Sequence, residues 1–434
     1  MGYWILMKRY KLILVITSIL FGSMLQAQST INSPYSRFGL GELHGKNVNA
    51  NIKGMGGISI GMNNSTLVNP GNPASYAVFD SLALVLEAGL VANIVSLKTD
   101  QFTENSQSAT LSYVLLGFPI NKWWKTSMGI MPYSKIGYNV NIDIDMSEYD
   151  FTNILNELEG EGGINRIYWG NAFNIGKNLR LGVDASYLFG NGSRNSTILF
   201  LDSLNIYGTK LEASTRAGGF IFDYGIQYDV HIGEKDVLTL GLIYANKWNL
   251  NATRKSLATT ITGGYYEIVE ETKDTIQFIP EEKGSLVIPT TFGIGAVYKR
   301  TGNWLVGVDF EWQKWSEFGG FGVPDTLENT LRVAVGGEFM PDHTSISSLF
   351  KRMTYRGGAR YGQTYVSANG NQINEFGISF GVSFPMKKSK TTIDLGLELG
   401  QRGTTKDNLI QENFFNVNFG VSIQEHWFYK RKYN

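Results

Sequence analysis

The sequence predicts an all-β protein, a 14-stranded antiparallel transmembrane β-barrel with an N-terminal plug, or hatch, in its lumen. Three observations lead to this prediction. From about Leu82 onward, apolar residues occupy every second position; the alternating segments are long; and the connections between them alternate between short and long. The composition agrees, with 50 glycines, 22 tyrosines, 25 phenylalanines and only 10 prolines.

The N-terminus has the order of a secretory signal. Lys8, Arg9 and Lys11 are basic, the run from Leu12 to Leu25 is mostly apolar, and Leu25-Gln26-Ala27 resembles a cleavage site. The alternative, a retained membrane anchor, is disfavoured because the run is short for a hydrocarbon core of ~30 Å. We therefore expect residues 1–27 to be a cleaved signal peptide and the mature chain to reach the cell outer membrane.

Residues 28–81 lack a strand pattern and are rich in glycine, asparagine and serine, as in Gly54-Met55-Gly56-Gly57 and Asn63-Asn64-Ser65. The lumen of a barrel of this size is too wide for wall side chains alone to fill. We expect this segment to fold inside the lumen as the plug. The alternative is a disordered periplasmic leader. The barrel domain is expected over residues 82–434.

The alternation defines the expected strands. Even-numbered positions from Phe220 to Ile232 are apolar or aromatic, whereas Asp223, Gln227 and Asp229 lie between them. In a strand these two sets face opposite sides of the sheet. The length of the alternating segments suits strands that cross a membrane at a tilt, which need ~9–11 residues. The fourteen expected strands are 83–98, 107–120, 124–142, 164–176, 179–192, 217–232, 236–254, 288–299, 303–315, 330–340, 354–366, 372–385, 390–401 and 413–430.

Connection lengths test the same topology independently. Turns after even strands are mostly short, and loops after odd strands are mostly long, as in barrels with periplasmic turns and outer loops. The expected outer loops are 143–163, 193–216, 255–287, 316–329 and 402–412. The 341–353 turn is too long and the 367–371 loop is too short for this rule.

Charged residues of both signs fall on the face that is expected to point into the lumen. They could line a hydrophilic permeation path, or they could form a network of ion pairs that holds the plug, which the mixture of signs favours. This candidate lumen network comprises Arg180, Asp184, Asp223, Asp229, Asp309, Glu311, Arg332, Glu338, Arg356, Arg360, Asp394 and Glu398.

The expected third strand contains a proline. Pro132 lies between Gly129 and Gly137, and proline cannot donate a hydrogen bond to a strand ladder. The sequence therefore predicts a kink and a local break in pairing. Such a break at bilayer depth could be a lateral opening, and a simple bulge near the rim is an equal alternative.

Other classes of function find little support. The chain has no cysteine, four histidines without metal-ligand spacing, no recognisable catalytic motif, and equal numbers of basic and acidic residues. We therefore expect no enzyme, no metal, no cofactor and no nucleic-acid partner. Outer-membrane lipid is an expected partner, through the aromatic residues 427–429 and basic residues 430–432. The acidic segment 143–163 could contact lipopolysaccharide through cations.

These features resemble the FadL/TodX family of outer-membrane transporters for hydrophobic compounds. Asn72-Pro73-Ala74 matches the NPA motif of the family's plug, and Pro132 matches its kinked third strand, which in that family opens the wall sideways. Pro289 with the 292–298 segment resembles its eighth strand, and Trp304 to Phe318 resembles its tryptophan-rich ninth. The resemblance implies passive uptake of hydrophobic small molecules, such as long-chain fatty acids, with lateral exit at the third strand.

Other stretches depart from that pattern. The opening from Asn32 to Gly41 and the ending in Trp427-Phe428 look like a Bacteroidota-specific branch. Arg332 to Phe339 and Tyr355 to Tyr361 also resemble PorV, a barrel that serves type IX secretion. This resemblance implies an alternative function, a barrel subunit of a type IX secretion or outer-membrane assembly complex.

Overall fold

The computed structural model describes residues 33–46, 48–142, 154–200, 206–262, 271–324, 326–342, 344–345, 347–386 and 389–426. The expected signal peptide, the acidic stretch 143–153 and the C-terminal aromatic residues 427–429 lie outside the described residues. Within the described ranges, no helix is long and apolar enough to cross a membrane.

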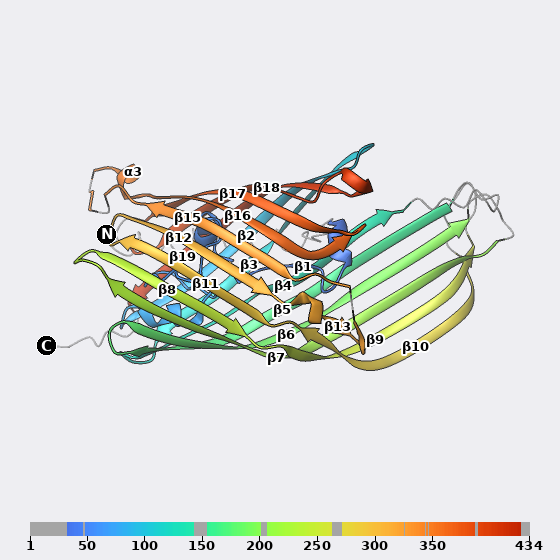
Figure 1. The fold of residues 1–434 in the computed structure, drawn as a ribbon, viewed down its shortest axis with the longest axis horizontal. Coiled ribbons are helices and arrows are strands. Elements are labelled where there is room, and N and C mark those ends of the chain that lie inside the picture. The colour runs from blue at the N-terminus through green and yellow to red at the C-terminus, as the bar shows by residue number, and fades with distance from the viewer. Residues whose placement is uncertain are drawn as a thin grey trace, which may run out of the picture.

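The described chain forms a closed antiparallel barrel whose wall has fourteen strands (Figure 1). Closure comes from the last strand, which pairs with the first from Gln411↔Lys98 to His426↔Ala83. β8 and β9 form one interrupted wall strand, as do β10 and β11. The wall segments are β2 (Ala83–Lys98), β3 (Thr103–Pro119), β4 (Trp124–Asn141), β5 (Ile154–Ile175), β6 (Leu179–Phe200), β7 (Gly208–His231), β8 (Asp236–Ala245), β9 (Trp248–Thr262), β10 (Glu271–Ile288), β11 (Thr291–Arg300), β12 (Trp304–Gln313), β15 (Thr330–Phe339), β16 (Thr354–Ala368), β17 (Asn371–Pro385), β18 (Thr392–Arg402) and β19 (Gln411–His426). The predicted fold class is confirmed.

The two faces of the wall have opposite chemistry. On β7, Phe220 and Ile232 are each 61% exposed on the outside, whereas Asp223 and Gln227 are buried inside. On β17, the outward Phe380 is 57% exposed. Apolar residues exposed outside and polar residues buried inside are the reverse of a water-soluble sandwich. This arrangement is that of a lipid-facing wall.

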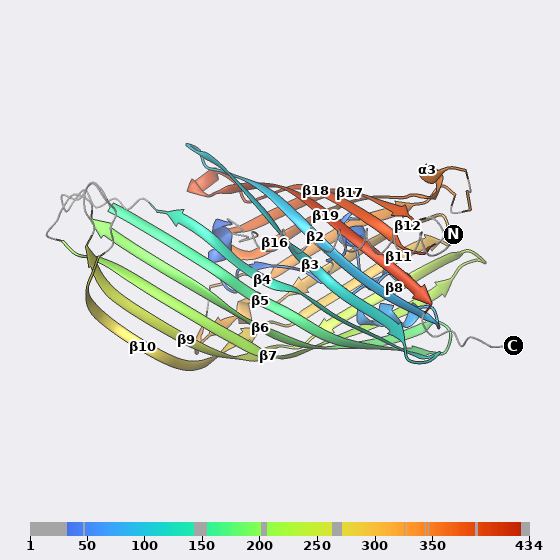
Figure 2. The ribbon, with the colours of Figure 1, turned by 180° about the vertical axis from the view of Figure 1, so that it is seen from behind.

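Five neighbouring segments continue beyond this apolar belt. On β7 the outward series of large apolar residues ends at Phe220, and Arg216, Ser214 and Glu212 continue it. The ladders nevertheless run on, to Ile198↔Thr209 between β6 and β7 and to Thr262↔Glu271 between β9 and β10. Figures 1 and 2 show these strands projecting past the other strands at one rim of the barrel, opposite to the rim where β2 begins and β19 ends. We call residues 154–163, 191–200, 208–218, 249–262 and 271–287 the sheet extension.

The sheet extension corrects the sequence prediction. Loops were expected at 193–216 and 255–287, and the described part of 143–163 was expected to be a loop as well. All three contain ladder-forming strands. The reason is that apolar alternation marks a strand only where one face meets lipid or a core. Outside the membrane the backbone ladder persists while both faces become polar, so the alternation disappears.

The N-terminal segment lies inside the barrel. It comprises η1 (Pro34–Arg37), β1 (Glu42–Leu43), α2 (Ala50–Lys53), η2 (Pro73–Val78) and the turns between them. Ile52, Met55 and Ile58 are completely buried, and they form a core with Val297, Leu305 and Ala334 of the wall. A second core joins Tyr76 and Phe79 to Leu115 and Tyr168. The expected plug is therefore present in the lumen.

Glycines on the inner wall let the plug backbone approach closely. A Cβ on Gly241 would lie 2.1 Å from the carbonyl oxygen of Ile60, and one on Gly336 would lie 2.1 Å from that of Met55. Real side chains do not tolerate such distances, so the plug would have to move. The high glycine content of the chain thus partly reflects contact between plug and wall.

Adjacent glycines of β16 provide a matched test of this contact. Gly358→Ala would place a methyl group 2.3 Å from the Met55 carbonyl carbon, whereas Gly357→Ala meets nothing closer than 4.0 Å. We expect Gly358→Ala to lower the free energy of unfolding by about 1–3 kcal/mol through overpacking, and Gly357→Ala to change it little. Urea titration followed by the heat-dependent gel shift of the barrel measures both. Equal effects of the two substitutions would contradict the close packing of plug against wall.

Candidate functional site

The wall is incomplete between β3 and β4. Their ladder contains only six pairs, from Pro119↔Lys125 to Val114↔Ile130. Each of the two strands pairs much farther with its other neighbour, β3 with β2 as far as Lys98↔Thr103 and β4 with β5 as far as Asn141↔Glu157. Residues 103–113 of β3 and 131–141 of β4 therefore form no ladder with each other, and Figure 2 shows the β2–β3 hairpin diverging from β4. We call this the β3–β4 gap.

The gap begins at the predicted kink. Pairing stops at Ile130, two residues before Pro132, and the register between β4 and β5 shifts between Pro132 and Ser134. Opposite this shift, Gly162 and Gly163 of β5 have φ values of +111° and +150°, which residues with side chains rarely adopt. A proline without an N–H and two adjacent glycines thus bend this part of the wall away from β3.

The plug covers the β4 edge of the gap. Glu42 and Leu43 of β1 pair with Lys135 and Ser134, and the backbone N–H of His44 donates to the Tyr133 carbonyl at 2.9 Å. Farther along, Ser33 N donates to the Gly137 carbonyl, also at 2.9 Å. The plug therefore takes the place that β3 leaves. Among the predicted kink residues, Pro132 and Gly137 lie along the gap, and Gly129 pairs with Leu115 just below it.

A cavity of about 300 Å³ lies behind the gap. Ser106, Ser108 and Thr110 of β3 line it on one side, and Pro132 and Tyr133 of β4 line it on another. His44 of the plug also faces this cavity. Burial lowers the pKa of His44 to about 4, against the opposing charge of Glu42, so its ring is neutral near pH 7. Much of the lining carries hydroxyl or charged groups.

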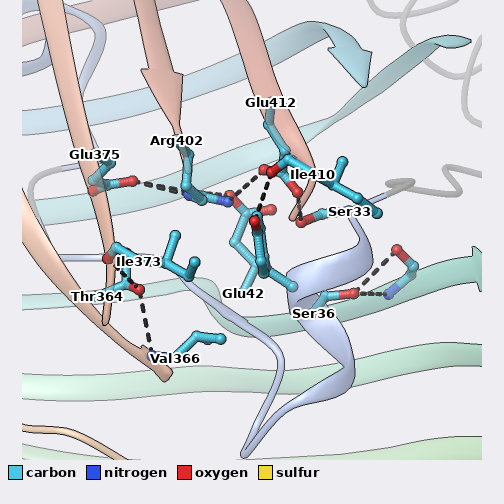
Figure 3. Close-up of polar contacts among 12 residues, drawn as sticks. Ser33, Ser36, Glu42, Thr364, Val366, Ile373, Glu375, Arg402, Ile410 and Glu412 are labelled. Carbon is cyan, nitrogen blue, oxygen red and sulfur yellow. Dashed lines mark hydrogen bonds and ion pairs between the residues drawn. The ribbon is translucent and has the colours of Figure 1, made fainter. Parts of the chain in front are cut away.

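Ion pairs cross the cavity and join the plug to the wall (Figure 3). Arg402 of β18 contacts Glu42 of the plug at 2.9 Å, Glu375 at 3.0 Å and Glu412 at 3.2 Å. Burial opposes ionisation of Glu42, but the guanidinium of Arg402 outweighs it and holds the pKa of Glu42 below its usual value. Arg360 bonds Glu398 at 2.5 Å and also pairs with Glu375. The Ser33 hydroxyl donates to Glu412 at 2.6 Å, and we call these six residues with Ser33 the cavity network.

A second group of predicted charges lies deeper in the barrel and contacts the plug or other wall residues. Arg180 forms two hydrogen bonds of 2.6 Å with Asp229, and Asp223 pairs with Lys46 of the plug at 2.7 Å. Asp309 accepts hydrogen bonds from the backbone N–H groups of Ser59 at 2.6 Å and Ile60 at 2.9 Å.

The remaining predicted charges also face inward. They contact plug backbone, plug side chains, neighbouring wall groups or the cavities. Arg332 donates to Gly56 and Gly57, Arg356 bonds Glu338, Asp184 accepts from Tyr76, Asp394 accepts from Ser422, and Glu311 lines the cavity.

The predicted plug motif is buried against β6 and β7 of the wall. The Asn72 side chain donates to the carbonyls of Ile60 at 2.8 Å and Ile226 at 3.2 Å. Its oxygen accepts from the N–H of Ala74 and so caps η2, which Pro73 begins. The motif thus closes a turn within the plug and ties this turn to β7 (Gly208–His231).

Several residues of these networks were not predicted. Arg402 and Glu412 were placed in a loop because strand alternation ends near them, and Glu42 lies in the unpatterned plug. Arg166, buried 3.8 Å from Asp223, lies on a predicted strand but was overlooked. Because Arg166 directly precedes the outward Ile167, the alternation could have placed its side chain in the lumen. Among the described residues, no group of three or more His, Cys, Asp or Glu side chains could hold a metal ion.

Comparisons with known proteins agree on the fold. The Pseudomonas putida toluene transporter TodX matches with a TM-score of 0.59 and 14% identity, over 90% of this chain and 100% of that one. A Pseudomonas aeruginosa FadL homologue matches with a TM-score of 0.57 and 13% identity, over 87% of this chain and 98% of that one. The Ralstonia pickettii toluene transporter TbuX matches with a TM-score of 0.56 and 13% identity, over 87% of this chain and 98% of that one. The resemblance to FadL/TodX channels is therefore confirmed as a likeness of fold.

Sequence comparison adds a family. A family model described as BamG matches residues 7–434, which is nearly the whole chain. No curated protein matches the sequence.

Replacing Arg402 tests whether the cavity network holds the plug against the gap. Arg402→Leu leaves the carboxylates of Glu42 and Glu412 buried without this partner, and breaking a buried pair costs up to about 3–5 kcal/mol. We expect residues 33–44 to separate from β4 and their amides to exchange hydrogen at least tenfold faster. Arg402→Lys should give an intermediate exchange rate, because lysine keeps the positive charge but lacks the planar guanidinium that can contact several carboxylates at once. Unchanged exchange in Arg402→Leu would show that the network does not hold this segment.

Proposed function

The chain belongs to the BamG family, and we propose that it is a non-enzymatic barrel subunit of an outer-membrane assembly complex. Its place would be the cell outer membrane, after signal-peptide cleavage, with lipid around the apolar belt. Of the two machines that the sequence left open, secretion and assembly, the family name favours assembly. The observation that carries the proposal is the sheet extension.

The sheet extension has the properties of a surface for another protein. On β10, most residues from Glu271 to Glu282 are exposed, and Ile276 and Phe278 are 60% and 61% exposed. Two large apolar side chains exposed next to each other on a polar strand, outside the apolar belt of the wall, favour a protein partner. The extension therefore supports docking more directly than transport.

The cavity also fits docking better than passage of an apolar molecule. Its arginines and carboxylates already pair with each other, and contacts of Glu42 with Arg402 and of Ser33 with Glu412 tie the plug to β18 and β19. A hydrophobic ligand would desolvate these charges without offering them hydrogen bonds, which is unfavourable. The network is better suited to hold a plug in one position.

A second function is favoured by one specific observation. The β3–β4 gap lies beside Pro132, where lateral exit was predicted, and the cavity borders on it. Passive uptake of hydrophobic small molecules, such as long-chain fatty acids, with exit through this gap is therefore the alternative. In this function the kink would be required for transport.

Substitutions on the sheet extension test the assembly function. We expect Ile276→Glu with Phe278→Glu to reduce the yield of co-purifying assembly subunits at least tenfold, because two exposed apolar side chains become charged. Phe350→Glu is the matched control, since Phe350 of α3 (Leu349–Arg352) is 71% exposed outside the extension. The yield is measured by quantitative mass spectrometry of the tagged barrel extracted in mild detergent. An undiminished yield in the double variant would contradict docking through this surface.

Straightening the kink tests the alternative. If the chain takes up hydrophobic molecules through the gap, Pro132→Val should abolish uptake of labelled oleate, because the new N–H allows the ladder between β3 and β4 to extend. Uptake by cells that carry the variant is compared with uptake by cells that carry the Pro119→Val control, at the short-turn end of β3. Unchanged uptake with Pro132→Val would eliminate lateral exit.

A further inference from the structure

The two edges of the β3–β4 gap differ. The β4 edge is covered by the plug, through β1 and the backbone N–H groups of Ser33 and His44. On the β3 side, residues 103–112 pair only with β2 in the described part of the chain. Thr103, Gln107 and Ala109 are exposed there. One face of the gap is thus completed internally, and the other presents an open sheet edge.

An open edge is costly at this depth. Leu111 and Ala109 pair with Leu90 and Ala92, which belong to the outward apolar series of β2, so residues 109–112 lie at the level of the lipid belt. The outward side chains of 103–107 are polar, so the edge continues past the belt. In hydrocarbon, a backbone N–H or C=O without a partner is strongly unfavourable. Along an antiparallel strand, every second residue directs both groups to the same neighbour. About half of the residues in this stretch therefore direct N–H and C=O groups into the gap.

We propose that the free edge of β3, residues 103–112, receives an amphipathic β-strand of a second outer-membrane protein. This inference rests on the proposed assembly function and names the kind of segment that the barrel binds. Ten residues extend over ~33 Å, so an incoming strand would begin in the lipid belt beside 109–112 and continue past it. Hydrogen bonds to the β3 backbone supply the affinity, as in other cases of strand addition.

The side chains along the edge define the chemistry of the incoming strand. Ser106, Ser108 and Thr110 face the cavity, whereas Gln107, Ala109 and Leu111 face outward. A strand paired in register would place polar residues toward the cavity and apolar residues toward lipid. Small residues on β3 leave room for large residues on the partner. An incompletely closed β-barrel exposes strands with this alternation.

A defined peptide tests the edge directly. The full-length barrel in phospholipid nanodiscs is mixed with a ten-residue peptide that alternates leucine and threonine, and hydrogen exchange is followed by mass spectrometry. We expect about half of the amides in 103–112 to exchange at least tenfold more slowly with the peptide, and β2 to be unchanged. The control peptide has the same composition with its leucines grouped. No slowing, equal slowing by the control peptide, or amides already as slow as those of β2 without peptide would overturn the proposal.

Neighbouring proline substitutions provide the matched variants. Ala109→Pro and Thr110→Pro remove N–H groups that point to opposite sides of β3, one to β2 and one to the gap. We expect one variant to lose barrel stability, and the other to keep wild-type stability but lose protection by the peptide. Peptide protection that persists in both variants would overturn strand addition.

The failure of this inference can be told apart from the failure of the proposed function. A photo-crosslinking residue at Gln107 is compared with one at Ile94, which faces outward on the paired strand β2. If assembly subunits co-purify but crosslink at neither position, the proposed assembly function is retained and strand addition at the β3 edge is ruled out. Peptide binding to the edge of a barrel that has no protein partner in its native membrane would support strand addition and overturn the assembly function.

Discussion

Hydrogen bonding between the plug backbone and the inner wall is the interaction on which the rest of the structure depends. A plug of short turns and single helical turns leaves many backbone groups without partners from secondary structure. Side chains of the wall act as the missing partners. Asp309 accepts hydrogen bonds from two backbone N–H groups of the plug, and Gln227 donates to the carbonyls of Ile60 at 3.0 Å and Met62 at 3.1 Å. Polar and charged groups of the lumen therefore act as a scaffold for the plug backbone.

This scaffold determines the state of the gap. Once the plug is held from β7 to β18, its first residues lie along β4 and occupy the edge that Pro132 frees. The wall is then open on the β3 side while the lumen remains filled. The same fold can thus serve lateral exchange of molecules or capture of a strand, depending on what meets that edge. The proposed assembly function corresponds to the second use.

Much of this arrangement follows from the sequence, and the remainder has physical reasons for escaping it. Period-two alternation identified all fourteen wall strands because lipid on one side and polar groups on the other impose it. Pro132 was predicted to interrupt pairing because it has no N–H, and the ladder between β3 and β4 stops two residues before it. The sheet extension was missed because β strands in water need no apolar face. Arg402 and Glu42 were missed because the contact joins two segments 360 residues apart, one of which has no periodic pattern. Such contacts depend on how the plug threads the lumen.

On the proposed function, this barrel works as a bound subunit rather than as a free channel. Native mass spectrometry of the tagged protein, extracted in mild detergent from its own outer membrane, distinguishes the two. We expect a complex in which the barrel is present in stoichiometric amount with at least one larger outer-membrane protein, and no retained apolar small molecule. A lone barrel that carries a co-purified apolar molecule would contradict the proposed function and would establish hydrophobic-compound transport instead.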